Sequence, residues 1–183
     1  AAHLTAAAAQ RAGPGEWRPA APGLDDDPRR PNEAGGLRLP DDGWAEAVSR
    51  ELHRFRALVV GPGLGTSLAT RGGVRLLLGS APVAAVVDGD GLAAVGRDLD
   101  VVRDRVAATV LTPHDGEFAR LAGDRPGPDR IAAARQLAAD AGAVVLLKGP
   151  TTVVAHPQGA ARVVAAGDQR LATAGTGDVL SGV

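Results

Sequence analysis

The chain has 183 residues, a length that suits a single domain, and its 45% hydrophobic content is ample for a core. It has 20 basic and 21 acidic residues, mixed along the chain, which argues against a nucleic-acid-binding or membrane-surface protein. The absence of Cys excludes disulfides, thiolate metal sites and cysteine nucleophiles, and fits a cytoplasmic location. No apolar run approaches the ~20 residues that would span a bilayer.

The first segment, residues 1–45, is predicted to be irregular or poorly ordered. Six prolines, from Pro14 to Pro40, interrupt any periodicity in it. Such a composition buries too little apolar surface to offset the entropy lost on ordering. Within it, a helix remnant is expected only from Ala6 to Arg11.

The remainder, residues 46–183, is predicted to form one α/β domain. Helical patterns cover 44–54, 67–79, 129–141 and 177–183, with Asp129 as a cap and Gly142 as a stop. Apolar runs predict strands at 57–60, 83–87, 109–111 and 143–147, followed by a hairpin of 152–155 with 162–165. Four apolar runs without polar alternation are typical of parallel strands buried on both faces. The predicted fold is a doubly wound, mainly parallel sheet flanked by helices.

The carboxyl end of each predicted parallel strand carries glycine together with ionisable or hydroxyl residues, or a run of glycines. The four loops read GPGLG (61–65), DGDG (88–91), TPHDGE (112–117) and KGPTT (148–152). In open parallel sheets, ligands gather at the carboxyl ends of the strands. The coincidence of four such loops therefore predicts a binding site at this edge.

The sequence AGTGDVL at 174–180 is the most informative stretch. Gly175, Thr176 and Gly177 can turn backbone N–H groups toward an anion at the start of a helix. Asp178 would then lie in the first turn beside a phosphate, where a carboxylate can take a proton from an attacking hydroxyl. The alternative is an ordinary helix start capped by Thr176 or Asp178.

The TPHDGE loop places His114 and Glu117 three residues apart, on one face of a helix start. His114 could hold a substrate amide or phosphate, and Glu117 a hydrated magnesium ion. The alternative is that both residues only cap the helix.

The other three loops each allow two interpretations. The GPGLG glycines indicate either a close approach of backbone to a ligand or a tight turn. Asp88 and Asp90 could coordinate a metal through water or form an Asx turn. Lys148 offers a cation to a phosphate, although lysines also end strands for solubility.

The ordered motifs GPGLG, DGDGL, LTPHxxEFxxL, LLKGPTTVV and LATAGTGDVLSG resemble those of the NAD(P)H-hydrate dehydratases, in the ribokinase-like superfamily. The resemblance covers residues 57–183. It implies a ribokinase-like domain that is incomplete at both ends, since the family's first strand and last helices have no counterpart. It also implies ADP-dependent dehydration of (S)-NAD(P)H hydrate to NAD(P)H, giving AMP and phosphate, with Mg²⁺.

The resemblance also implies roles for individual residues. Asp178 would be the base and a substrate contact, and Gly177 part of the anion hole and of the nucleotide site. Glu117 matches the metal-linked Glu of related kinases. The hydrated dinucleotide would contact Gly63, Gly65 and His114. The nucleotide would contact Lys148, Gly149, Pro150, Thr151 and Thr152.

Two other functions stay open. One is a small-molecule kinase of the hydroxymethylpyrimidine or pyridoxal type, which has Asn where this chain has His114. The other is a non-catalytic nucleotide-binding module, which would not need Asp178. A homo-oligomer, and an epimerase that is fused to the chain or separate from it, are also open.

Overall fold

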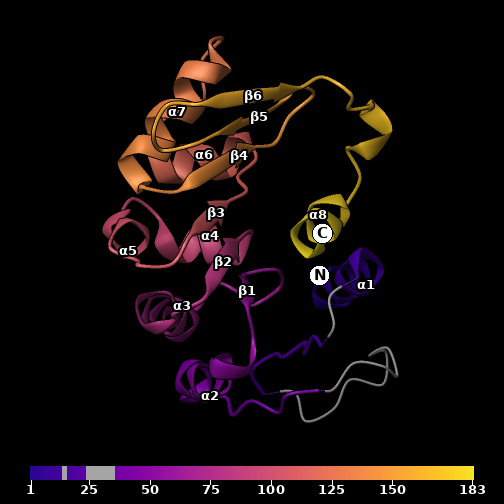
Figure 1. Ribbon diagram of the computed structural model, residues 1–183, viewed down its shortest axis with the longest axis vertical. Coiled ribbons are helices and arrows are strands. Elements are labelled where there is room, and N and C mark those ends of the chain that lie inside the picture. Colours follow the sequence, from indigo (N-terminus) through magenta and orange to yellow (C-terminus); the bar gives the residue numbers. More distant parts are fainter. Residues whose placement is uncertain (14–15, 24–35) are drawn as a thin grey trace.

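The computed structural model describes residues 1–13, 16–23 and 36–183. None of the helices in these parts of the chain is long and apolar enough to cross a membrane. The elements follow in chain order (Figure 1): α1 (Ala2–Ala12), α2 (Trp44–Glu51), η1 (Leu52–Arg54), β1 (Ala57–Val60), α3 (Leu68–Ser80), β2 (Ala84–Val87), α4 (Asp90–Val95), α5 (Asp100–Arg103), β3 (Thr109–Leu111), α6 (Asp115–Ala122), α7 (Arg130–Ala141), β4 (Val144–Leu147), β5 (Thr152–Ala155), β6 (Ala161–Val164), η2 (Gln169–Leu171) and α8 (Thr176–Gly182).

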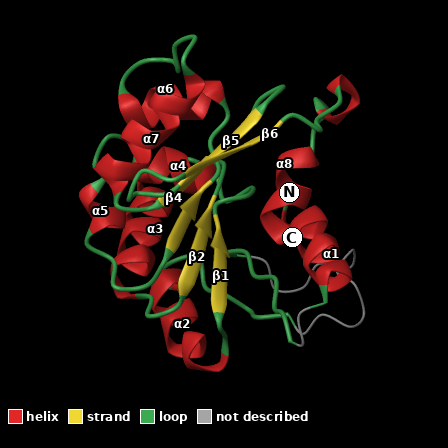
Figure 2. Cartoon of the chain, turned by 45° about the horizontal axis from the view of Figure 1, so that its top comes forward, coloured by secondary structure: helices red, strands yellow, loops and turns green. Residues whose placement is uncertain are grey.

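The strands form one sheet in the order β1-β2-β3-β4-β5-β6. Strands β1 to β4 are parallel, and β5 and β6 add an antiparallel hairpin. Helices α3 to α7 lie on one side of the sheet, whereas α1 and α8 lie together on the other side (Figures 1 and 2). The predicted α/β class, with a mainly parallel sheet flanked by helices, is confirmed.

The local signals in the sequence also act as expected at several element ends. The Asp129 carboxylate accepts from the Ala132 N–H at 2.9 Å, and Gly142 ends α7 in the left-handed conformation. The Ser67 hydroxyl caps α3 by accepting from the Thr70 N–H. The helix predicted at 44–54 is divided into α2 and a 3₁₀ turn, because the chain tightens before it enters β1.

The first segment contains a longer helix than the predicted remnant. Helix α1 covers Ala2–Ala12, ends at Gly13 in the left-handed conformation, and buries Ala6 and Ala8. It packs against α8 from the other end of the chain. Residues 16–23 and 36–43 lack helices and strands apart from a bridge between Pro22 and Leu39, and residues 14–15 and 24–35 lie outside the described residues.

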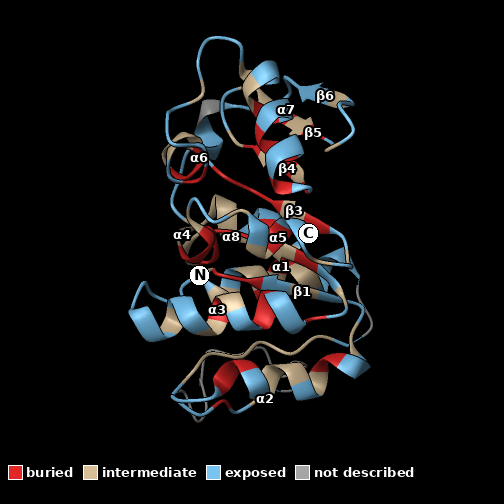
Figure 3. Cartoon of the chain, turned by 90° about the vertical axis from the view of Figure 1, so that its left-hand side faces the viewer, coloured by how far each residue is buried: buried red, intermediate tan, exposed pale blue. Residues whose placement is uncertain are grey.

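The two faces of the sheet are buried to different extents (Figure 3). The face under α3 to α7 is closed from β2 to β5 and at the end of β1, where these residues are 5% exposed or less: Val60, Ala85, Val87, Thr109, Leu111, Val145, Leu147, Val153 and Ala155. On the other face Val86, Val110 and Val144 are only half-buried, and Val59 is 38% exposed. The prediction that the strands are buried on both faces therefore holds for one face only, because the side chains of α1 and α8 do not close the second face.

The carboxyl ends of β1 and β2 interlock through two glycines. Gly61 has a φ of +126°, and a Cβ on it would collide with the carbonyl oxygen of Asp88. Gly91 is also tight, since its Cβ would lie 2.7 Å from the Val60 carbonyl oxygen. That same oxygen accepts from the Asp88 N–H at 3.2 Å. These glycines therefore allow the backbone of Asp88 to lie directly against the end of β1.

Gly61→Ala should destabilise the fold by more than about 2 kcal/mol, because it combines a strained positive φ with a backbone collision. Gly72→Ala is a matched control, since Gly72 lies inside α3 with no atom within 4 Å of its Cβ position. That change should stabilise by about 0.5–1 kcal/mol, as Ala is the better helix former. Urea unfolding of the full-length variants measures both effects, and equal midpoints would contradict the interlock.

Candidate active site

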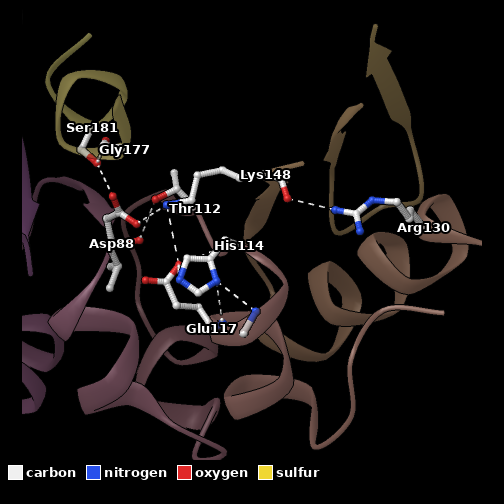
Figure 4. A network of polar contacts seen from close by, with 10 residues as sticks. Asp88, Thr112, His114, Glu117, Arg130, Lys148, Gly177 and Ser181 are labelled. Carbon is white, nitrogen blue, oxygen red and sulfur yellow. Dashed lines mark hydrogen bonds and ion pairs between the residues drawn. The ribbon is translucent and has the colours of Figure 1, made fainter. Parts of the chain in front are cut away.

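The four loops at the carboxyl ends of β1 to β4 meet at one edge of the sheet, as the topology predicts. A buried ion pair lies at their centre (Figure 4). Asp88, at the end of β2, is 4% exposed, and its Oδ1 lies 2.8 Å from Lys148 Nζ, at the end of β4. Its Oδ2 accepts a hydrogen bond of 2.7 Å from the Ser181 hydroxyl in α8. One carboxylate thus joins two strands and a helix.

Opposing effects act on the pKa of Asp88. Burial raises this pKa, because a carboxylate loses solvation in the protein. Hydrogen bonds from Lys148 and Ser181, the charge of Lys148 and the nearby Thr112 hydroxyl all lower it. The lowering effects prevail, so the pKa lies below its ordinary value of 3.8 and the ionised form is favoured. Asp88 is therefore a fixed negative charge under Lys148 at neutral pH.

Lys148 faces two carboxylates and the start of α8. Its Nζ lies 3.6 Å from Glu117 Oε2 as well as 2.8 Å from Asp88. A Cβ on Gly177 would lie 3.4 Å from the same nitrogen, so the first turn of α8 passes close to the ammonium group. The side chain is 20% exposed, which leaves it accessible to a ligand. Lys148 and Gly177, which the resemblance assigns to the same nucleotide site, therefore lie close together.

Helix α8 begins without a side-chain cap. Gly175 precedes it with a φ of +94°, and no side chain bonds to its first N–H groups. The alternative interpretation, in which Thr176 or Asp178 caps the helix, is therefore not what the structure contains. Asp178 lies in the first turn, outside the Asp88–Lys148 network, and its Oδ2 is 3.7 Å from the amino group of Ala1.

His114 and Glu117 form a reciprocal capping box at the start of α6. His114 Nδ1 accepts from the N–H groups of Gly116 and Glu117 at 2.9 and 3.2 Å. Glu117 Oε2 accepts from the His114 N–H at 2.9 Å. This is the capping interpretation of the pair, although the imidazole is also 58% exposed and points into the site region. Capping and ligand contact are compatible here, because capping uses only Nδ1.

The GPGLG turn is held by the second aspartate of DGD. Gly63 and Gly65 have φ of +75° and +82°, conformations that favour glycine. The Gly65 N–H donates to Asp90 Oδ2 at 2.8 Å. Gly63 lies against Ala1, the residue that also approaches Asp178, so this turn and the start of α8 face the same region.

The KGPTT loop connects β4 to the antiparallel β5. Gly149 and Pro150 are exposed, Thr151 is half-buried, and Thr152 already belongs to β5. The Lys148 N–H donates to the Pro113 carbonyl at 2.8 Å, which fastens the start of this loop to the end of β3.

Three residues of this site were absent from the predicted set: Asp88, Ser181 and Arg130, whose guanidinium donates to the Lys148 carbonyl at 2.9 Å. The DGD motif did signal Asp88, but as a metal ligand or turn residue rather than the partner of Lys148. Ser181 lies within the motif LATAGTGDVLSG but was given no role there, and Arg130 belongs to no motif, since the partners of both residues lie far away in the sequence. Within the described residues no group of three or more His, Cys, Asp or Glu side chains could hold a metal ion.

The lowered pKa of Asp88 predicts an acid-sensitive contribution to stability. A carboxylate whose pKa is lower in the folded state stabilises the fold above its unfolded pKa, and this contribution is lost as pH falls through the folded pKa. Asp88→Asn cannot titrate, so its unfolding free energy should fall less steeply between about pH 5 and 2.5. Urea unfolding across this range measures the slope. Asp104→Asn, a change at an exposed position, is the control, and equal slopes for the two variants would refute the role of the pair.

Comparison with known proteins identifies the family. A family model described as NAD(P)H-hydrate dehydratase matches residues 1–183. A bifunctional NAD(P)H-hydrate repair enzyme of Mycobacterium tuberculosis (strain CDC 1551 / Oshkosh) is 52% identical over 144 residues, which cover 76% of this chain and 30% of that protein. The corresponding enzyme of Mycobacterium leprae (strain TN) is 47% identical over 139 residues, or 76% of this chain and 29% of that protein. The chain thus spans under a third of the length of these relatives.

Solved structures agree with this assignment. An ADP/ATP-dependent NAD(P)H-hydrate dehydratase from Bacillus subtilis, co-crystallised with ATP/Mg²⁺ and soaked with CoA, has a TM-score of 0.77 and 27% identity. The match covers 99% of this chain and 66% of the B. subtilis chain. A ribokinase-like superfamily protein from Enterococcus faecalis V583 has a TM-score of 0.80 and 20% identity, over 98% of this chain and 63% of that one, and supports the fold alone. The chain therefore belongs to the NAD(P)H-hydrate dehydratase family and has a ribokinase-like fold.

Proposed function

We propose that the full-length protein dehydrates (S)-NAD(P)H hydrate to NAD(P)H with ADP as phosphoryl donor, giving AMP and phosphate. The observation that carries this proposal is the Asp88–Lys148–Ser181 network. It holds an ammonium group beside Gly177, at the uncapped start of α8. A fixed cation next to backbone N–H groups that no side chain caps is suited to a transferring phosphoryl group.

The nucleotide would lie along the loop after β4. Lys148 supplies the charge that faces phosphate, and its accessible neighbours supply further contacts: Gly149, Pro150, Thr151 and Thr152. Gly177 closes this site from α8, and with Gly175 and Thr176 it forms the anion hole. The family membership and the ADP/ATP-dependent relative from B. subtilis support this assignment.

The hydrated dinucleotide would bind between the GPGLG turn and the first turns of α6 and α8. Gly63 and Gly65 allow its close approach, and His114, whose side chain is 58% exposed, offers Nε2. Asp178 removes the proton of the substrate hydroxyl as this oxygen attacks the terminal phosphorus of ADP. AMP leaves when the old phosphorus–oxygen bond breaks. Elimination of phosphate from the substrate, with loss of a proton from the neighbouring carbon, then restores the nicotinamide double bond.

Magnesium would neutralise charge on the phosphate oxygens when bound. The residue suited to hold it is Glu117, because its capping and lysine contacts all use Oε2. Among the described residues its Oε1 makes no hydrogen bond, so it can accept from the water shell of a hydrated ion. One carboxylate together with substrate phosphates is a common magnesium environment.

The setting of the reaction belongs to the same proposal. The mycobacterial relatives are bifunctional repair enzymes, which supports a second activity, an epimerase, in the same protein or in a partner. We place the enzyme in the cytoplasm, because a chain without Cys forms no disulfides and therefore needs no oxidising compartment. A homo-oligomer is compatible with both assignments.

A small-molecule kinase is the second candidate, and one observation keeps it open. His114 caps α6 through Nδ1, a role that an Asn side chain performs equally well. His114 therefore does not by itself separate a dehydratase from a kinase that has Asn in this position. The kinase would phosphorylate a hydroxyl without a following elimination, so the appearance of reduced nicotinamide distinguishes the two.

The direct test is to incubate the full-length protein with hydrated NADH and ADP and to follow the recovery of NADH absorbance. Asp178→Asn should reduce turnover by ~10²-fold or more, because it removes the general base, and should leave ADP binding intact. The matched control is Asp168→Asn, an exposed carboxylate that pairs with Arg170 and should have normal turnover. Normal turnover of Asp178→Asn would remove Asp178 from the mechanism.

His114→Asn separates capping from substrate contact. Asn preserves the cap, so the melting temperature should stay within about 2 °C of wild type, whereas kcat/KM for the hydrated dinucleotide should fall by about tenfold if Nε2 contacts it. His156→Asn is the control, because His156 Nδ1 also accepts from a nearby N–H, that of Gln158, but in the distant β5–β6 turn. Unchanged kinetics for His114→Asn would leave His114 with the capping role alone.

A further inference from the structure

Arg130 lies outside the loops of the site and contacts two of them, those after β3 and β4. It is the first residue of α7, and its guanidinium points toward the end of β4 (Figure 4). One terminal nitrogen donates to the Lys148 carbonyl at 2.9 Å, and the other to Asp115 Oδ1 at 2.8 Å. Lys148 begins the loop assigned to the nucleotide, and Asp115 follows His114 in the turn assigned to the dinucleotide. The arginine thus links both loops.

The contact with Lys148 completes the anchoring of that residue. The Lys148 N–H is bonded to Pro113, its side chain to Asp88, and its carbonyl to Arg130. Without Arg130, the peptide that leads into Gly149 would be free to rotate away from the site. The direction in which the loop leaves the sheet therefore depends on this one guanidinium.

The same guanidinium accounts for the glycine at position 149. A Cβ on Gly149 would lie 2.7 Å from an Arg130 terminal nitrogen and 3.2 Å from its Cζ. The loop therefore passes directly beneath the guanidinium, and any side chain at 149 would push the two apart. This contact gives a reason for glycine in KGPTT that involves no positive φ.

Arg130 makes these contacts while one of its own donors stays unused. Its Nε is buried and has no hydrogen-bond partner among the described residues. Leaving a buried donor unpaired is unfavourable, so this orientation is not the one that maximises the hydrogen bonds of the side chain itself. The two terminal nitrogens are placed by the positions of Lys148 and Asp115.

We propose that Arg130 is a positioning residue that holds the nucleotide loop, residues 148–152, in register with the His114 turn. The inference rests on the proposed function, because it assumes that these two loops bind the two reactants. Phosphoryl transfer requires the donor phosphorus and the acceptor oxygen to lie about 3–3.5 Å apart, and a displacement of about 1 Å can reduce the rate by 10²-fold. A guanidinium that fixes one loop relative to the other controls this distance without touching either reactant.

The test is Arg130→Ala in the full-length protein, with ADP affinity measured by calorimetry and kinetics by the hydrated-NADH assay. We expect weaker ADP binding and a 10- to 100-fold loss in kcat/KM. The control is Arg135→Ala, which removes an exposed arginine from the same helix and should alter neither quantity. Wild-type ADP affinity and kinetics in Arg130→Ala would overturn the proposal.

A second variant pair separates positioning from general stability. Gly149→Ala should weaken ADP binding in the wild-type background, because the new methyl group displaces the guanidinium. In the Arg130→Ala background the space is vacant, so the same change should weaken ADP binding several-fold less, a coupling expected for residues in contact. Strictly additive losses in affinity would overturn the proposal.

Conservative variants keep the test decisive if Arg130→Ala does not fold. Arg130→Lys retains the charge but cannot reach both acceptors with a planar fork, so its ADP affinity should be intermediate; wild-type affinity and kinetics would overturn the proposal. Asp115→Asn removes only the ion pair, and should raise the KM for hydrated NADH more than that for ADP.

A wild-type protein that binds ADP but does not dehydrate refutes the proposed function while leaving the loop test valid. A wild-type protein that does not bind ADP overturns both.

Discussion

The arrangement of the site depends on one buried ion pair, between Asp88 and Lys148. A buried carboxylate is unfavourable unless it is paired and hydrogen-bonded, and Lys148 and Ser181 meet that requirement. Because the two partners come from the end of β4 and from α8, satisfying one charge fixes both elements against the end of β2. The surroundings hold the pair in turn: Gly61 admits the backbone of Asp88, and Arg130 holds that of Lys148. The position of the Lys148 ammonium group is thus a consequence of backbone packing as much as of the lysine itself.

Most of the fold could be predicted from local sequence. The strands follow from apolar runs bounded by glycine and proline, and α7 follows from Asp129 and Gly142, because these signals act within a few residues. Helix α1 was underestimated, since it is rich in Ala and followed by prolines, and its stabilising partner is α8 at the other end of the chain. The half-exposed second face of the sheet was also missed, because an apolar strand has the same sequence whether or not helices cover it.

The location of the site was predictable, but its internal contacts were not. Parallel strands deliver their carboxyl ends to one edge, so the four loops had to meet. Which side chains pair there depends on distances of a few ångströms between residues 60 and 93 positions apart, which no local pattern encodes. His114 illustrates the remaining ambiguity. The same imidazole can cap a helix and contact a ligand, and the spacing to Glu117 is identical for both roles.

These sequence separations also bear on how the molecule folds. Contacts between distant residues form slowly, because a long loop must lose entropy before the contact stabilises it. Asp88 meets Lys148 across 60 residues and Ser181 across 93, and α1 meets α8 across almost the whole chain. During synthesis on the ribosome, Asp88 is made long before either partner and stays hydrated until both have emerged. The first three parallel strands can pair by then, so desolvation of the charge that organises the site follows the pairing of these strands.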